Sequence, residues 1–461
     1  MTAASSSQLS NPRSARIAAY VAGAFQRQYP DEVIAAAKQA IIDFVGVCVG
    51  AADDDPVRPV RQVVERWASP GKARMFLGGC TTPALAALVN GTMGHAMDFD
   101  DAHTMGAGHL SVPCGVTAFG FANELGSSEQ DILAAFITGF EVNARLGGGG
   151  VNGVGRNLHK RGFHPTGILS RFGAASVAGA LMRLPEEQIE YAMGIAATTA
   201  GGLLGSFGTH SKPFHSGKAA MDGILAAEMA AAGFQGAKKL FDVSEAGFLS
   251  AYIQEGKVEV PELDFEDRWE ILRNGYKPYA SGRAAHAIIK AAQTLCEKVQ
   301  GRNIARVRAR IHPNAALTMG NPSPRTALES KFSVRFCIAL ALRGYRLAAT
   351  DFCIDNVNNP KLRELLPLIE LEIVPDQPAH EALMDITLQG GEQLHSETKI
   401  VPGHPDNPMS AADFKAKFLG LVEPKIGTDR AAALLDVLQN FERPGSFTGV
   451  MSLVDAGARS C

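Results

Sequence analysis

The strongest constraint on the fold is a long succession of helical segments that are rich in alanine and glycine. Between about Arg16 and Leu240, apolar residues recur at spacings of three and four, and turn residues separate the segments. Residues 30–50 start with Pro-Asp-Glu, and residues 127–147 start with capping serines and end with glycine. Helices that carry small residues on several sides pack closely against several neighbours. This part of the chain therefore predicts a large helical bundle.

The pattern changes past about Gly275. Three short segments alternate apolar and polar side chains: residues 306–312, 369–374 and 383–389. A Gly-Gly pair at 390–391 predicts a hairpin after the last of them. Alternation with one polar face is typical of an antiparallel sheet that is exposed on one side. The other face would be covered by two apolar helices, which we expect over 283–299 and 326–342.

The predicted fold is therefore a large all-α helical domain plus a smaller α+β domain, with an antiparallel sheet and helices on one face. A chain of 461 residues is long enough for both. We expect a disordered tail over residues 1–15, an all-helical domain over 16–270 and 402–461, and an α+β lid domain over 271–401. The last segment joins the helical domain because helical patterns return after residue 410.

The composition narrows the possible partners and location. A net charge of −3 provides no basic field for nucleic acid or an anionic membrane surface. No apolar run reaches about 18 residues, so we expect no membrane span. The 7 cysteines have no CxxC or zinc-type spacing, which predicts free thiols in the cytoplasm. An anionic ligand must then be held by a local basic pocket.

The stretch GHAMDFDDAHTMGAGH, from Gly94 to His109, places three aspartates and three histidines among apolar surroundings. Three such carboxylates cannot all be buried and ionised unless solvent, cations or a bound proton neutralises them. The histidines lack metal-ligand spacing and no second acidic cluster occurs on a helix, so we predict no metal. General acid–base chemistry between Asp98 and His109 is one interpretation, and a solvated loop with capping aspartates is the other.

Further titratable residues occur in three later motifs. His164 lies in KRGFHPTG, Lys212 in GTHSKPFHSGKAA, and Lys277 and Arg283 in NGYKPYASGRAAH. A lone histidine beside Phe and Pro is also typical of a packed core. Cations at helix N-termini oppose the helix dipole, however, and a bound carboxylate would compensate for them. Together these motifs predict a pocket for a small polycarboxylate.

These motifs, in this order and over most of the chain, resemble the MmgE/PrpD family, which includes 2-methylcitrate dehydratase, cis-aconitate decarboxylase and iminodisuccinate epimerase. The resemblance implies a homodimer that uses no metal and no organic cofactor. It also implies that five residues are catalytic: Asp98, His109, His164, Lys212 and Lys277. Arg283 is expected to help bind the substrate.

The chain departs from the family pattern at several positions. Ala102 replaces a common threonine, Gly282 a cysteine or histidine, and Phe336 a common tyrosine. Leu110 and Ala280 each replace a proline. We count Ala102, Gly282 and Phe336 as substrate-binding positions, and their loss of polar groups predicts a roomier, less polar pocket.

The family's shared chemistry is a carbanion next to a carboxylate. Lys212 and Lys277 are predicted to stabilise the developing negative charge. Asp98 and His109 would exchange protons, and His164 would orient a second carboxylate or serve as the second acid. The predicted function is a cofactor-independent lyase that dehydrates or decarboxylates a small polycarboxylate. Two alternatives remain open: an epimerase or racemase of an amino- or imino-dicarboxylate, and a catalytically silent homologue.

Overall fold

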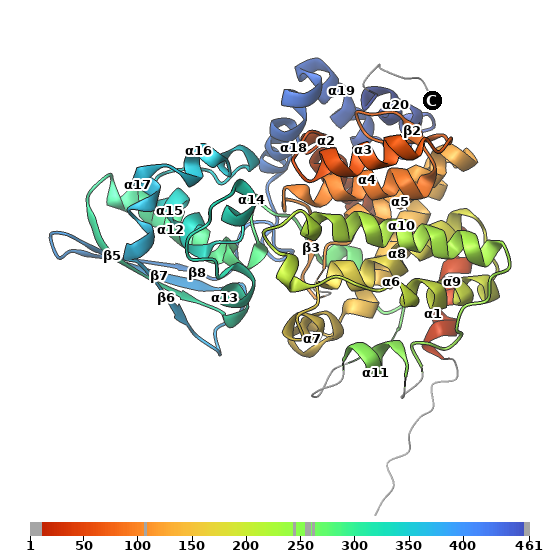
Figure 1. Ribbon diagram of the computed structural model, residues 1–461, viewed down its shortest axis with the longest axis horizontal. Helices are drawn as coiled ribbons and strands as arrows, with labels where there is room; N and C mark the ends of the chain where they lie inside the picture. Colours follow the sequence, from red (N-terminus) through yellow and green to blue (C-terminus); the bar gives the residue numbers. More distant parts are fainter. Residues whose placement is uncertain (1–11, 106–107, 243–245, 254–259, 261–262, 456–461) are drawn as a thin grey trace, which may run out of the picture.

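The computed structural model describes residues 12–105, 108–242, 246–253, 260 and 263–455 (Figure 1). Helix α1 (Arg13–Ala22) starts inside the tail predicted over 1–15. Its start is held because the Ser14 hydroxyl donates a hydrogen bond of 2.7 Å to the Asp242 carboxylate. The tail prediction is thus wrong for residues 13–15, and residues 1–11 lie outside the described part.

A bundle of helices makes up the larger part of the molecule (Figure 1). It contains α1, α2 (Asp31–Gly50), α3 (Val57–Trp67), α4 (Pro83–Ala96), α5 (Ser111–Leu125), α6 (Glu129–Gly147), α7 (Val154–Lys160), α8 (Pro165–Leu181), α9 (Glu186–Thr198), α10 (Ser211–Ala231) and α11 (Phe248–Tyr252). Ser128 caps α6 by accepting from the Asp131 amide, as the sequence predicts.

Small residues let these helices approach closely, as their composition predicts. Where α4 meets α10, a Cβ placed on Gly91 would lie 2.6 Å from the Gly217 Cα. Likewise, a Cβ on Gly217 would lie 2.2 Å from the Leu88 carbonyl oxygen. Only glycine fits at this crossing, so the start of α10 is fixed against α4.

The α+β unit lies beside the bundle (Figure 1). Its helices are α12 (His286–Val299), α13 (Pro313–Met319), α14 (Ala327–Ser330), α15 (Val334–Leu342), α16 (Ile354–Val357) and α17 (Pro360–Arg363). Its strands are β5 (Ile304–Ile311), β6 (Ile369–Ile373), β7 (Ala382–Leu388) and β8 (Gln393–Thr398), in the order β6-β5-β7-β8. Helix α12 contacts β5, β7 and β8 and covers the buried face.

The predicted antiparallel sheet is wrong at one edge. Strand β7 pairs antiparallel with both β5 and β8, and the hairpin at 390–391 is confirmed, but β6 runs parallel to β5. The helical connection over residues 312–368 returns the chain to the same end of the sheet, and such a crossover produces a parallel pair. Alternation of side chains defines the buried face but not the strand direction.

The C-terminal helices return to the bundle and pack near α2 (Figure 1). They are α18 (Ala411–Ile426), α19 (Thr428–Gln439) and α20 (Ser446–Leu453). Within the described residues, α2 is the one helix long and apolar enough to cross a membrane, and 72% of that window is buried inside the protein. The boundaries predicted at 270/271 and 401/402 stay predictions.

Two short ladders complete the fold: β1 (Ala73–Arg74) with β2 (Cys80–Thr81), and β3 (Ala102–His103) with β4 (Asn274–Gly275). Cys80 is disulfide-bonded, so the expectation of free thiols is wrong there, because spacing along the chain does not reveal which cysteines meet in the fold. Five other cysteines are free thiols: Cys48, Cys114, Cys296, Cys337 and Cys353.

Candidate functional site

The acidic stretch between α4 and α5 is buried rather than solvated. Asp98 is 2% exposed, and Asp100 and Asp101 are fully buried. The interpretation as a solvated loop is therefore wrong. Each carboxylate is compensated in a different way, as burial of three neighbouring acids requires.

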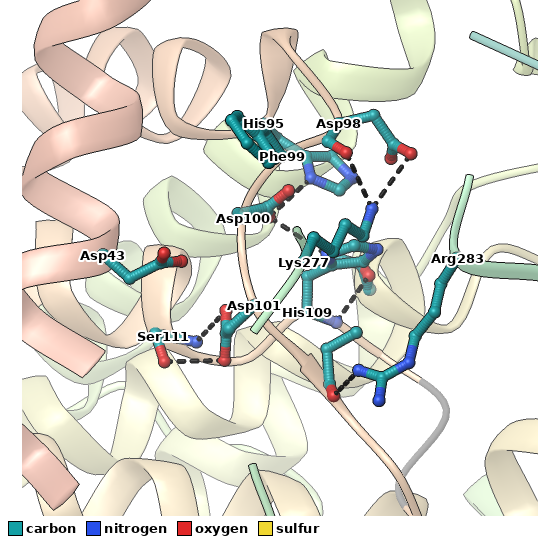
Figure 2. Close-up of polar contacts among 12 residues, drawn as sticks. Asp43, His95, Asp98, Phe99, Asp100, Asp101, His109, Ser111, Lys277 and Arg283 are labelled. Atoms are coloured by element: carbon teal, nitrogen blue, oxygen red, sulfur yellow. Dashed lines mark hydrogen bonds and ion pairs between the residues drawn. The ribbon is translucent and has the colours of Figure 1, made fainter. Parts of the chain in front are cut away.

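Asp98 is held between two lysines, Lys212 and Lys277, of which Figure 2 shows Lys277. The Lys277 Nζ donates to the Asp98 Oδ2 and to the Asp98 carbonyl oxygen, both at 2.9 Å, and the Lys212 Nζ donates to Oδ1. Asp98 has a left-handed φ of 50°, a conformation that aspartate tolerates better than most residues. Burial opposes its charge, but Lys212 and Lys277 lower the pKa of Asp98 well below its usual range.

The fold explains why two lysines so distant in sequence meet. Lys212 lies in the first turn of α10, and the glycine contact described above holds that turn near the end of α4. Lys277 follows β4, and β4 pairs with β3 immediately after the acidic stretch. A third lysine, Lys331, donates from its Nζ to the Met97 carbonyl oxygen at 2.9 Å. Burial lowers the pKa of Lys331 to about 8.

Asp100 faces two histidines. Its Oδ2 lies 2.8 Å from the His95 Nδ1 and 3.1 Å from the His109 Nδ1 (Figure 2). Burial opposes the charge of Asp100, but these two histidines lower its pKa well below its usual range. Burial also lowers the pKa of His95 to about 3 and lowers that of His109, which favours the neutral imidazole at both positions.

Asp101 is turned away from these groups and supports α5. Its carboxylate accepts from the Ser111 hydroxyl at 2.7 Å and from the Ser111 amide at 3.3 Å (Figure 2). Burial, together with Asp100 and Asp43, raises the pKa of Asp101 to about 7. Asp101 is therefore the member of the trio that holds a proton most readily.

His164 is buried at the N-terminus of α8 and joins the same cluster. Its ring stacks on His95 with centroids 5.6 Å apart, and its Nδ1 lies 3.0 Å from the His215 Nδ1. Burial and the nearby Lys212 lower the pKa of His164 well below its usual range. Two neutral imidazoles can share a proton in a hydrogen bond of this length.

A cavity of about 190 Å³ lies over these groups, between the bundle and the α+β unit. All five residues proposed as catalytic line it, and so do three of the four proposed substrate-binding residues, Ala102, Gly282 and Arg283. Other polar residues of its wall are His103, Thr104, Arg156, His159, Thr166, Asn314, Thr318, His380 and His404. The structure thus brings the predicted site residues together, while their roles remain proposals.

Phe336 is the exception among the predicted residues. It is fully buried in α15 and does not line the cavity, so its assignment to substrate binding is wrong. The prediction of extra room beside Gly282 is also wrong. A Cβ on Gly282 would lie 2.6 Å from the Met319 Sδ, which means that Met319 fills that space.

Sequence reasoning left several residues of the site without a role. His95 lies five residues before Asp100 and was rejected as part of a metal motif, although the same spacing lets it contact that carboxylate. Arg156 and His159 lie on α7, inside a glycine-rich stretch that gave no functional signal. Lys331 lies at the break between α14 and α15, where the sequence predicts one continuous helix.

The cluster also has the composition of a metal site. One ligand atom from each of His95, Asp98, Asp100 and His109 lies within 4.8 Å of the others. However, both oxygens of Asp98 accept from lysine ammonium groups, which already neutralise its charge. A dication next to two ammonium groups would be repelled, so these residues fit lysine pairing better than metal ligation.

The fold and the site define a protein with a helical body, a smaller α+β unit and a cavity lined by cationic side chains. Comparison with known families agrees: the MmgE/PrpD N-terminal domain matches residues 15–261, and the MmgE/PrpD C-terminal domain matches residues 279–443. The chain belongs to the MmgE/PrpD family.

Curated relatives carry one recurring activity. Cis-aconitate decarboxylase of Mus musculus is 27% identical over 437 residues, covering 89% of this chain and 87% of that protein. The enzyme of the same name from Homo sapiens is 28% identical over 376 residues, covering 78% and 77%. That of Aspergillus terreus is 24% identical over 465 residues, covering 94% and 93%. At these identities the relatives indicate a lyase.

Proposed function

We propose that this protein is a lyase that decarboxylates a small unsaturated tricarboxylate of the cis-aconitate type without a cofactor. The observation that supports it most is a small cavity in which two buried lysines, already bridged by Asp98, face two neutral histidines. The names of the relatives favour decarboxylation over the dehydration that the motifs alone placed first.

The reaction needs a place for an electron pair. When the carboxyl group on the methylene carbon of cis-aconitate leaves as CO₂, the pair of the broken C–C bond shifts through the alkene. It comes to lie on the carbon next to the far carboxylate, where an aci-carboxylate forms. A proton delivered to that carbon completes methylenesuccinate. Nothing is oxidised or reduced outside the substrate.

Lys212 and Lys277 are the groups proposed to stabilise this aci-carboxylate. Asp98 keeps both ammonium groups charged and close together although they are buried. A preorganised donor of this kind lowers the barrier by roughly 3–4 kcal/mol, since it need not reorganise as charge develops. The lysines are thus aimed at the carboxylate whose charge grows.

The proton donor in this proposal is His109. Asp98 cannot serve, because its pKa lies well below the usual range and both of its oxygens accept from lysines. His109 borders the cavity and is backed by Asp100, which stabilises an imidazolium. A bound polyanion raises the pKa of His109, so that the imidazole becomes protonated and can act as the acid. This replaces the hypothesis that Asp98 exchanges protons.

His164 is proposed to orient a second carboxylate or to act as a second acid. It lines the cavity with His109, and a pair of acid–base groups is what dehydration of a hydroxy-acid would need. Dehydration of a 2-methylcitrate-type substrate is therefore the second candidate. Epimerisation of an imino-dicarboxylate would need the same two histidines on opposite faces of the substrate.

One panel of substrates separates these reactions. The protein is incubated in D₂O with cis-aconitate, citrate, 2-methylcitrate or iminodisuccinate, and the products are followed by mass spectrometry and CO₂ release. Decarboxylation predicts CO₂ from cis-aconitate and one deuterium on a carbon of the product. An alkene formed from a hydroxy-acid would indicate a dehydratase, and deuterium exchange without another change an epimerase. No reaction with any substrate would contradict the proposed lyase.

We also propose a homodimer, as the resemblance implies, and a cytoplasmic location, as the lack of CxxC or zinc-type cysteine spacing indicates. Exposed apolar side chains on and just after α10 support a contact surface on this side of the bundle: Phe214, Leu225 and Phe234. A mass measurement by light scattering tests it. A dimer that becomes monomeric when Phe214 and Leu225 are both changed to Gln supports this surface, and a monomeric wild type contradicts it.

A further inference from the structure

We propose that Arg156 binds the one substrate carboxylate that is neither lost as CO₂ nor held by the lysine pair. The inference rests on the proposed function, because it assigns a specificity-determining residue to the same cavity. Arg156 lies on α7 and lines the cavity wall. The sequence gave no reason to select it.

Arg156 differs from the other cations of the wall in having no partner among the residues that the structure describes. Lys212 and Lys277 pair with Asp98. The guanidinium of Arg283, which Figure 2 labels, donates to the Ala102 carbonyl oxygen at 2.6 Å. In the part of the chain that the structure describes, no hydrogen bond or ion pair involves the Arg156 guanidinium. Its five N–H donors are therefore available to a ligand.

Within the described ranges of the chain, no acidic side chain shifts the pKa of Arg156. The positive charge of Arg156 lowers the pKa of Arg283, His159 and His312, and none of these three groups is acidic. Burial lowers the pKa of Arg156, and no carboxylate raises it again. Arg156 is partly buried, and no acidic side chain among the described residues neutralises it. An anionic ligand in the cavity would supply the missing counter-charge.

The helix that carries Arg156 is firmly placed. Val154 and Leu158 are buried on its inner side, and the Asn157 Nδ2 donates to the Asn152 and Gly153 carbonyl oxygens at 2.7 and 2.9 Å. Arg156 is therefore presented to the cavity by an anchored element rather than by a loose loop. A fixed guanidinium recognises a planar carboxylate through two parallel hydrogen bonds.

The charges of the cavity wall decide which cation can bind each of the three substrate carboxylates. The carboxylate next to the developing carbanion belongs at Lys212 and Lys277. The leaving carboxyl group must be free of a strong cationic contact, because such a contact would stabilise the ground state against loss of CO₂. The remaining, central carboxylate is the one that Arg156 can bind without opposing the reaction. Arg156 thus selects tricarboxylates over dicarboxylates.

Two unreactive acids test this assignment by calorimetry. Tricarballylate carries all three carboxylates, and glutarate lacks only the central one. We expect Arg156→Gln to weaken tricarballylate binding about 10- to 100-fold, the range for a charge-assisted hydrogen bond, and to leave glutarate binding within about threefold. Lys160→Gln is the matched control, because it removes one exposed positive charge from the same helix.

The folded state is checked separately. Without ligand, Arg156→Gln should melt at the wild-type temperature or above it, since it removes a partly buried charge that has no partner among the described residues. Arg156→Lys should restore part of the preference for tricarballylate. Equal weakening of both ligands, or no change in either, would overturn the role of Arg156. So would a wild type that does not bind tricarballylate more tightly than glutarate.

These outcomes are distinct from failure of the proposed function. A wild type that prefers tricarballylate but releases no CO₂ from cis-aconitate would sink the decarboxylase and leave Arg156 as a tricarboxylate-binding residue. A wild type that releases CO₂ while Arg156→Gln shows an unchanged KM for cis-aconitate would sink only the inference about Arg156.

Discussion

The Asp98→Asn variant probes the central feature of the site, because it leaves two buried ammonium groups without their counter-ion. Asp98 and both lysines are at most 2% exposed, so water cannot replace the lost carboxylate. Breaking a buried ion pair in this way destabilises a protein by about 3–5 kcal/mol. We expect a loss of that size in the free energy of unfolding at pH 7, measured by urea denaturation.

Two further measurements separate this mechanism from general damage. The loss of stability in Asp98→Asn should become smaller between pH 7 and 10. Burial holds the pKa of Lys212 in the folded state below its value in the unfolded state, so the folded variant releases this proton at a lower pH than the unfolded chain does. Tricarballylate should stabilise the variant more than the wild type, since its carboxylate takes the place of Asp98. Asp267→Asn is the control, because it breaks only partly exposed ion pairs, worth about 0–1 kcal/mol. Wild-type stability at pH 7, or no extra stabilisation by the ligand, would refute the argument.

Three other variants follow from the same geometry. Lys212→Ala should lower kcat/KM for the substrate at least ~100-fold, and near wild-type turnover would remove it from the site. Gly217→Ala should destabilise the protein by about 1–3 kcal/mol and lower activity, because the added Cβ would lie 2.2 Å from the Leu88 carbonyl oxygen. Gly420→Ala is the control: a Cβ at this position meets no atom within 4 Å, so the variant should be as stable as the wild type or more stable. Asp101→Asn should gain stability relative to the wild type as the pH rises from about 4 to 7. Folding raises the pKa of the wild-type Asp101 carboxyl from 3.8 to about 7, so across this range the carboxyl holds its proton only in the folded state. The wild type therefore loses roughly 4 kcal/mol of folding free energy over this range, and the variant does not. Urea denaturation at pH 5 and pH 8 tests it, and equal effects at both would contradict it.

The sequence predicts the helices well because their determinants are local. The capping serine before α6 and the periodic apolar residues of α2 define these elements without reference to the rest of the fold. The parallel pairing of β6 with β5 depends instead on how the helical connection over 312–368 folds back. Periodicity contains no information about that path, and the predicted sheet fails there for this reason.

In the candidate site, too, some residues can be predicted from local motifs and others only from the packing of the fold. The motifs selected Asp98, Lys212 and Lys277, and the fold brings all three together through the glycine crossing of α4 with α10 and the ladder of β3 with β4. Arg156 was not selected, because a single arginine in a glycine-rich stretch resembles a surface residue. Its significance depends on the absence of a partner among the described residues, which only the packing reveals.

The charge balance of the cavity connects binding with proton supply. Its wall carries four cationic side chains, Arg156, Lys212, Lys277 and Arg283, against Asp98 and, behind His109, Asp100. These groups leave an excess of two positive charges, and a bound trianion adds three negative charges. Binding should therefore take up about one proton. We expect that proton on His109, because the neighbouring Asp100 carboxylate stabilises the imidazolium. Calorimetry of tricarballylate binding at pH 8 in two buffers of different ionisation enthalpy measures this uptake, and affinity should fall as the pH rises. His109→Gln should abolish the uptake. If the uptake is absent, or if it persists in that variant, the proton that quenches the carbanion comes from another group.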